Sequence, residues 1–116
     1  RKTVGPESQE IAAVLEDIAC VFVDRDMFDK AYEKHEESLN ILRALLPPLN
    51  HRLAFALFNM ATCKEMLGEN EAAIACAREA HAIYSARGIT QGAAQGVVNI
   101  LNRQEGIQAL SQGGPF

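Results

Sequence analysis

Residues 15–31 read LEDIACVFVDRDMFDKA, and this stretch decides the fold. Its apolar residues recur at steps of three and four, the spacing of one face of an α-helix: Leu15, Ile18, Ala19 and Phe22. Ala31 follows nine residues after Phe22, in the next helical segment. Because bulky side chains would hold two crossing helices apart, the small residues Ala19 and Ala31 predict a closely packed helix pair.

The same series returns further along the chain. A shift of 42 residues superimposes residues of the same kind: Ala12 on Ala54, Leu15 on Leu57, Ala19 on Ala61, and Ala31 on Ala73. A second shift, of 40 residues, does the same for the next stretch: Ala54 on Ala94, Leu57 on Val97, and Asn59 on Asn99. The sequence therefore contains a helix pair of about 40–42 residues, present about two and a half times.

The capping and breaking residues divide the chain into five expected helices. The first follows Ser8 and fades near residues 24–26, and the others cover residues 28–46 and about 50–67, 70–86 and 91–110. Ser8 can cap the first helix, and Pro47-Pro48 stops the second. Gly68 and Gly88 are expected to end the third and fourth. The fifth contains three glycines: Gly92, Gly96 and Gly106.

These helices predict an all-α fold, a right-handed α-solenoid of antiparallel helix pairs. Its expected core is Leu15, Ile18, Ala19, Phe22, Ala31, Leu57, Met60, Ala61 and Ala73. Residues 1–116 are expected to form a single domain, or a fragment of one, with repeat 1 over 7–46 and repeat 2 over 50–87. A half repeat or capping helix then covers 90–110, and a loose tail covers 111–116.

The chain resembles the tetratricopeptide repeat (TPR) family from residue 1 to about residue 110. Its longer unit resembles the variants found in kinesin light chains and in Pins/LGN-type adaptors. The resemblance is carried by Ala31 to His35 with Leu39 and Ile41, and by the stretch from Ala86-Arg87-Gly88 to Asn99-Ile100. The second unit departs from the first where Lys64 and Asn70 stand in place of the aromatic Phe22 and Phe28. Asp26, in turn, stands in the first unit where the second has Gly68.

In a stack of helix pairs, the first helix of each pair lines a concave groove. The expected groove residues are Glu16, Asp17, Cys20, Asp24, Phe55, Phe58, Asn59, Thr62, Glu65, Met66, Gln95 and Asn99. The resemblance implies that Asn59 and Asn99 hydrogen-bond the backbone of a bound peptide. The other interpretation is an asparagine that is simply exposed or that hydrogen-bonds within its own repeat. Phe58 is either a groove anchor or a packing contact with the neighbouring repeat, and the packing interpretation is slightly preferred.

Charge indicates which partners to expect. The chain carries 15 acidic and 11 basic residues, a net charge of −4, which argues against generic binding of nucleic acid. No apolar run approaches the ~20 residues that cross a bilayer. The expected groove is acidic, so a basic or neutral protein segment is favoured over an acidic tail. Consistently, Glu16 and Cys20 stand where TPR domains that clamp acidic chaperone tails need Lys and Asn.

No motif for catalysis, a cofactor or a metal is found. His35, His51 and His81 lack ligand spacing, and His35 and His81 are expected to pack between repeats. Three cysteines form no disulfide framework, which favours a reducing, cytoplasmic setting. The sequence thus predicts a non-enzymatic scaffold that binds a protein or peptide partner. The alternative is a structural segment whose repeats pack within a larger protein or form homo-oligomers.

Overall fold

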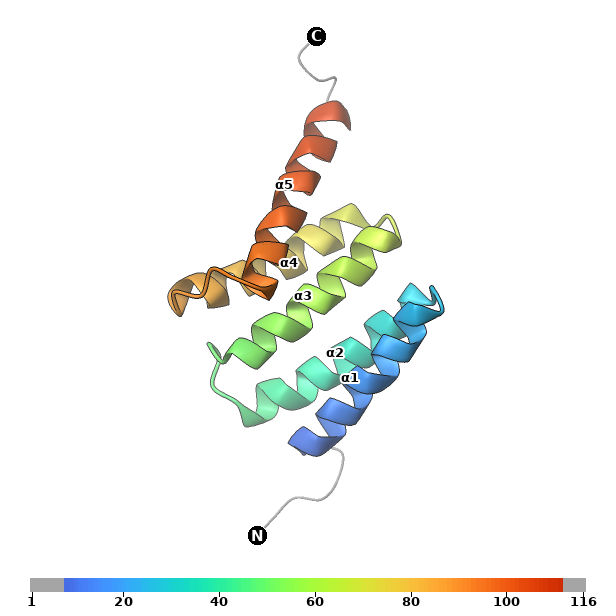
Figure 1. The fold of residues 1–116 in the computed structure, drawn as a ribbon, viewed down its shortest axis with the longest axis vertical. Helices are drawn as coiled ribbons and strands as arrows, with labels where there is room; N and C mark the ends of the chain where they lie inside the picture. The colour runs from blue at the N-terminus through green and yellow to red at the C-terminus, as the bar shows by residue number, and fades with distance from the viewer. Residues whose placement is uncertain (1–7, 112–116) are drawn as a thin grey trace.

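The computed structural model describes residues 8–111, and these form five α-helices. They are α1 (Gln9–Asp24), α2 (Phe28–Leu45), α3 (His51–Met66), α4 (Asn70–Ala86) and α5 (Ala93–Ser111). Each helix packs against the next along the chain, and α3 also touches α5. Figure 1 shows this order, with α1 and α5 passing in front of α2 and α4. The predicted all-α solenoid of helix pairs is confirmed.

The helices begin where polar side chains satisfy free backbone N–H groups. Ser8 Oγ accepts a hydrogen bond from the Ile11 N–H at 3.1 Å, and Asn50 Oδ1 accepts one from the Arg52 N–H at 2.9 Å. Pro47 follows the last residues of α2, which ends at Leu45. The predicted bounds of the first four helices agree with the structure to within two residues.

The same turn closes α1, α3 and α4. Asp26, Gly68 and Gly88 have φ values of 58°, 75° and 68°, in the left-handed region. The N–H of the following residue then reaches back to a helix carbonyl: Met27 to Phe22, Glu69 to Lys64, and Ile89 to Tyr84, at 2.8–2.9 Å. Asp26 thus occupies the position of a turn glycine, as the alignment of the two units indicates.

The start of the fifth helix differs from the prediction. The helix begins at Ala93, whereas the sequence indicated residue 91. Gly92 lies outside the helix, because its φ of 67° belongs to the turn that precedes it. Gly96 and Gly106 lie inside α5.

Most of the residues expected in the core are buried or half-buried, but the prediction that Ile18 lies in the core is wrong. Ala19, Ala31, Leu57, Met60, Ala61 and Ala73 are buried, and Leu15 and Phe22 are half-buried. Ile18 is 38% exposed, because α1 packs closely against α2 alone and Ile18 points elsewhere. Within residues 8–111, no helix is both long and apolar enough to cross a bilayer. The tail expected at 112–116 lies outside the described residues.

Candidate functional site

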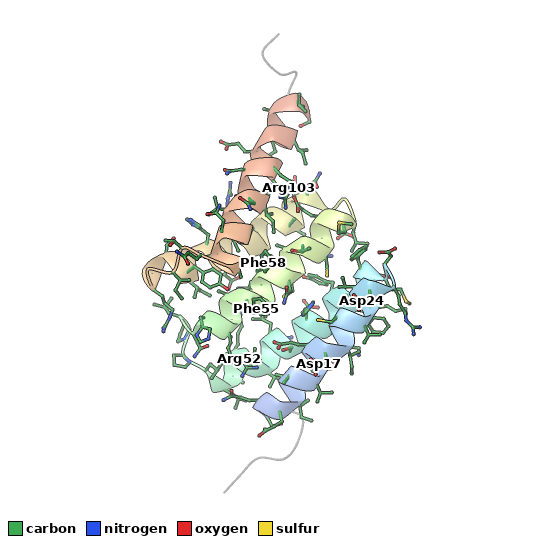
Figure 2. The ribbon with its side chains drawn as sticks, viewed as in Figure 1. Asp17, Asp24, Arg52, Phe55, Phe58 and Arg103 are labelled. Atoms are coloured by element: carbon green, nitrogen blue, oxygen red, sulfur yellow. The ribbon has the colours of Figure 1, made fainter. Side chains whose placement is uncertain are left out.

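The expected groove residues lie on the first helix of each pair. Glu16, Asp17, Cys20 and Asp24 lie on α1, and Gln95 and Asn99 lie on α5. The remaining six lie on α3: Phe55, Phe58, Asn59, Thr62, Glu65 and Met66. Figure 2 labels Asp17 and Asp24 on α1, and Phe55 and Phe58 on α3.

A cavity of about 180 Å³ brings four of these residues together between α1, α2 and α3. It is lined by Cys20, Val23, Asp24, Phe28, His35, Asn59, Thr62 and Cys63. Asp24 is exposed at this cavity, whereas Asn59 is half-buried. Other hollows lie further along the stack, and of the expected groove residues only Gln95 lines one of them. The cavity between the first three helices is therefore the best candidate site.

His35, on α2, is the most buried polar side chain of this cavity, with 2% of its surface exposed. Burial lowers the pKa of His35 to about 4, so its ring is neutral near pH 7. Its Nδ1 has no hydrogen-bond partner among residues 8–111. Burial also raises the pKa of the Cys63 thiol to about 11. The inner wall is therefore uncharged and offers one unused hydrogen-bonding atom.

Glu16 lies outside the cavity. Its carboxylate accepts a hydrogen bond from Ser38 Oγ at 2.9 Å, and Ser38 is completely buried. This contact joins α1 to α2, so Glu16 acts as a link between the helices of the first pair. Asp17 and Cys20 remain exposed on α1.

The carboxylate of Glu65 is already occupied. Arg103 donates two hydrogen bonds to it, at 2.8 and 3.2 Å, and Gln104 Nε2 donates a third at 2.9 Å. Burial alone would raise the pKa of Glu65, but these bonds outweigh it and hold that pKa below its usual value. Glu65 therefore attaches α5 to α3, and its charge is neutralised by Arg103.

Phe58 packs against the neighbouring repeat, the interpretation that the sequence preferred. A Cβ added to Gly96 of α5 would lie 2.7 Å from Phe58 Cε1, so the ring fills the space that this glycine leaves. Phe55 is 45% exposed, and its ring centroid lies 6.2 Å from that of Phe58. Of the two rings, Phe55 is the more exposed.

Asn59 and Asn99, the two asparagines expected to bind a peptide backbone, have different surroundings. Asn59 lines the cavity, whereas Asn99 on α5 accepts a hydrogen bond from Gln95 Nε2 at 3.0 Å. Thr62 Oγ1 donates to the Phe58 carbonyl at 3.1 Å, within its own helix, and Met66 is 60% exposed. Only Asn59 therefore combines the expected register with a place in the candidate site.

Sequence reasoning placed His35 between repeats but did not connect it with the groove. The cavity needs side chains from the second helix of the pair, and the groove argument considered only first helices. His81, also expected between repeats, is instead exposed, with Nε2 3.5 Å from Ser85 Oγ. Among residues 8–111, no group of three His, Cys, Asp or Glu side chains is placed to hold a metal ion.

Comparison with known proteins places the chain in a family. A model of the tetratricopeptide repeat matches residues 10–86. No curated protein matches the sequence. Among solved structures, the chain is similar to BtubC (BKLC) from P. vanneervenii, with a TM-score of 0.62 and 18% identity. That match covers 93% of this chain and 50% of BtubC, so the chain spans half the length of that protein. The chain belongs to the tetratricopeptide repeat family.

Proposed function

We propose that the protein binds a peptide segment of a partner protein at the cavity between α1, α2 and α3. TPR repeats generally mediate protein–protein interaction, which supports a binding role without catalysis. The observation that carries the proposal is the meeting of Cys20, Asp24, Asn59 and Thr62, from two first helices, around one cavity. A volume of about 180 Å³ suits a single ligand side chain rather than a small-molecule substrate.

The chemistry of the cavity favours a basic or neutral ligand side chain. Val23, Phe28 and Cys63 offer an apolar wall for an aliphatic stem. Asp24 offers a carboxylate where the cavity meets solvent. His35, neutral and with an unpaired Nδ1, adds a hydrogen-bonding atom that carries no charge. A lysine or arginine side chain has this combination of an apolar stem and a cationic head, whereas an acidic side chain would meet Asp24 unfavourably.

The test is a peptide-library screen with the full chain, followed by affinity measurements on the selected peptides. Asp24→Asn should weaken a basic peptide roughly fivefold, the equivalent of about 1 kcal/mol for an exposed ion pair. Asn59→Ala should weaken basic and neutral peptides alike. Glu33→Gln, at an exposed carboxylate of α2, is the matched control and should change nothing. The proposal fails if the selected peptides bind the Asp24→Asn and Asn59→Ala variants as tightly as they bind the unmodified chain.

We propose further that, within the TPR family, the chain is related to kinesin light chains and to Pins/LGN-type adaptors. The 40–42-residue unit and the residues quoted from the second helix and the repeat junction support this relationship. An adaptor role in the cytoplasm follows from that kinship as part of the same proposal.

Self-association is the second candidate function, and exposed apolar residues at both ends of the stack favour it. Ile11 and Val14 on α1 are 37% and 52% exposed, and Ile107 and Leu110 on α5 are 42% and 76% exposed. Light-scattering mass from micromolar to hundreds of micromolar protein tests it. A constant mass of 12.7 kDa counts against self-association, and a rising mass supports it.

A further inference from the structure

A hollow at the junction of α4 and α5 is larger than the candidate cavity between α1, α2 and α3. It lies where the end of α4, the turn over residues 87–92 and the start of α5 meet. Its volume is about 330 Å³, at the lower end of the range of roughly 300–1,000 Å³ that ligand pockets have. The two sites have no lining residue in common. We call this hollow the α4–α5 pocket.

The internal repeat contains the same junction with larger side chains. The shift of 42 residues places His81 on Leu39 of α2, and the shift of 40 residues places Val98 on Phe58 of α3. Leu39 is 3% exposed and belongs to the main core cluster, and Phe58 packs against that cluster. His81 is exposed, and Val98 has no ring. The α4–α5 pocket therefore lies where the earlier junction has an aliphatic and an aromatic side chain of its own.

The arrangement of the helices agrees with this comparison. In Figure 1, α2 and α3 run nearly alongside each other, whereas α5 crosses α4 steeply and extends beyond the other helices. The contact between α4 and α5 is also less extensive than that between α2 and α3. Both walls of the pocket belong to helices that already pack against each other, so the pocket is not a face left for a neighbouring repeat.

The inner part of the α4–α5 pocket is apolar. Tyr84 and Ala94 are 6% and 5% exposed, and Ile89 and Val98 are half-buried. Burial raises the pKa of Tyr84, so its hydroxyl stays neutral at physiological pH. An aliphatic or aromatic group would lose little by entering these surroundings, because they exclude water and carry no charge.

The rim of the pocket is polar and contains no Asp, Glu, Lys or Arg. Its exposed residues are His81, Ser85, Thr90 and Gln95. Ser85 Oγ lies 3.5 Å from His81 Nε2, longer than a strong hydrogen bond, so both atoms remain able to bond a ligand. A charged group would give up hydration here without gaining an ion pair. The pocket therefore suits an uncharged group with an apolar body and a hydrogen-bonding tip.

We propose that the α4–α5 pocket binds the ring of a tyrosine or tryptophan side chain of a partner protein. Phenol and indole rings have an apolar body and one polar atom, and they favour sites that are apolar at one end and wet at the other. The TPR family generally binds proteins, which favours a side chain over a free small molecule as the source of the ring. The proposal rests on partner binding as the function, but not on the cavity between α1, α2 and α3.

The test measures the affinity of the full chain for blocked pentapeptides that have Trp, Tyr, Leu or Glu between pairs of glycines. Chemical shifts of the protein amides report binding of all four peptides. Since the chain contains no tryptophan, indole fluorescence of the Trp peptide provides a second measure without background. The Trp peptide should bind with a Kd on the order of a millimolar, as expected for a single ring. The Leu and Glu peptides should bind at least about fivefold more weakly.

Variants of the full chain locate the binding. His81→Leu combined with Val98→Phe copies the side chains of the earlier junction and should weaken the Trp peptide about tenfold or more, because it fills the pocket. His81→Leu alone should weaken it about threefold and keeps the test valid if the double variant does not fold. His51→Leu, at an exposed histidine outside the pocket, is the matched control and should leave the affinity unchanged. Circular dichroism and melting temperatures check that each variant is folded.

Four results would overturn the proposal. The first is a Leu or Glu peptide that binds as tightly as the Trp peptide. The second is an unchanged affinity in folded variants with the filled pocket. The third is free indole that binds as tightly as the Trp peptide, which would make a small molecule the occupant. The fourth is a loss of affinity in Asn59→Ala but not in the pocket variants, which would place the ring in the other cavity.

The two sites can be judged separately. The peptide screen at the cavity between α1, α2 and α3 depends on Asp24 and Asn59, neither of which lines the α4–α5 pocket. Failure of that screen therefore leaves the pentapeptide measurements unchanged. Failure of the pentapeptides to bind at His81 and Val98 leaves the cavity as the binding site.

Discussion

At the scale of single residues, Gly96 and Gly106 are two helical glycines of α5 with different surroundings. A Cβ at Gly96 would lie 2.7 and 2.8 Å from Phe58 Cε1 and Cζ, whereas a Cβ at Gly106 would have no atom within 4 Å. Gly106→Ala should raise the free energy of unfolding by up to about 1 kcal/mol, because alanine favours the helix. Gly96→Ala should fall short of that gain by about 1–3 kcal/mol, because the Phe58 ring must move. Urea unfolding of the two variants measures the difference.

The double variant Gly96→Ala with Phe58→Ala is the control for this contact. Once the ring is absent, Gly96→Ala should recover the gain expected at an open helical position, so the two substitutions should not be additive. If Gly96→Ala and Gly106→Ala stabilise the chain equally while Phe58 is present, the Phe58 ring can move aside at little energetic cost.

His35 links stability to pH. Its pKa is lowered from 6.5 to about 4 by burial, so the unfolded chain takes up the proton before the folded chain does as pH falls. The contribution of the neutral ring is complete above about pH 6.5 and is lost as pH falls towards 4, by up to about 3 kcal/mol. His35→Gln should flatten this part of the stability profile. His51→Gln, at an exposed histidine, should keep the slope of the unmodified chain, and an unchanged slope in His35→Gln would contradict the assignment.

At the scale of elements, α5 is attached to α3 through the Glu65 carboxylate. Arg103→Ala removes two of the three hydrogen bonds at this carboxylate and should cost about 1 kcal/mol, since the arginine is half exposed. The loss should be local: amide exchange should rise in the second half of α5 and stay unchanged in α1 and α2. Glu105→Ala, at the exposed neighbouring position, is the control. Uniformly faster exchange in all helices would mean that α5 does not open on its own.

Most helix bounds could be predicted because their causes are local. Ser8, Gly68 and Gly88 act through the backbone of their own turns, so the sequence alone reveals them. Gly92 was misplaced because a glycine at a helix start and one inside the helix look alike in sequence.

The site was only partly predictable, because its contacts join separate elements. Asp24 and Asn59 could be assigned to the groove from the repeat register. The role of Glu65 depends on Arg103, 38 residues away, and the role of Phe58 depends on how closely α5 approaches it. Ile18 was misassigned because helical spacing identifies an apolar face but does not say whether another helix covers it.

At the scale of the whole molecule, the protection of each helix against amide hydrogen exchange depends on the helices that pack against it. α3 contacts α2, α4 and α5, whereas α1 packs closely against α2 alone. Amide hydrogen exchange should therefore be slowest in α3 and faster in α1 and α5, with the ends opening before the centre. Mass spectrometry of the exchanged chain measures this order. Exchange in α1 as slow as in α3 would show that another helix covers α1 in solution.

The three thiols of the chain differ in a way that offers a chemical handle. Cys20 is exposed at the cavity, whereas Cys63 is buried, and burial raises the pKa of both Cys63 and Cys76. Since thiolates are the reactive form, a maleimide dye at neutral pH should label Cys20 first. The protein thus has a natural attachment point for a fluorescent reporter beside its candidate site. A dye on Cys20 would report the binding of a peptide at this site without any engineered cysteine.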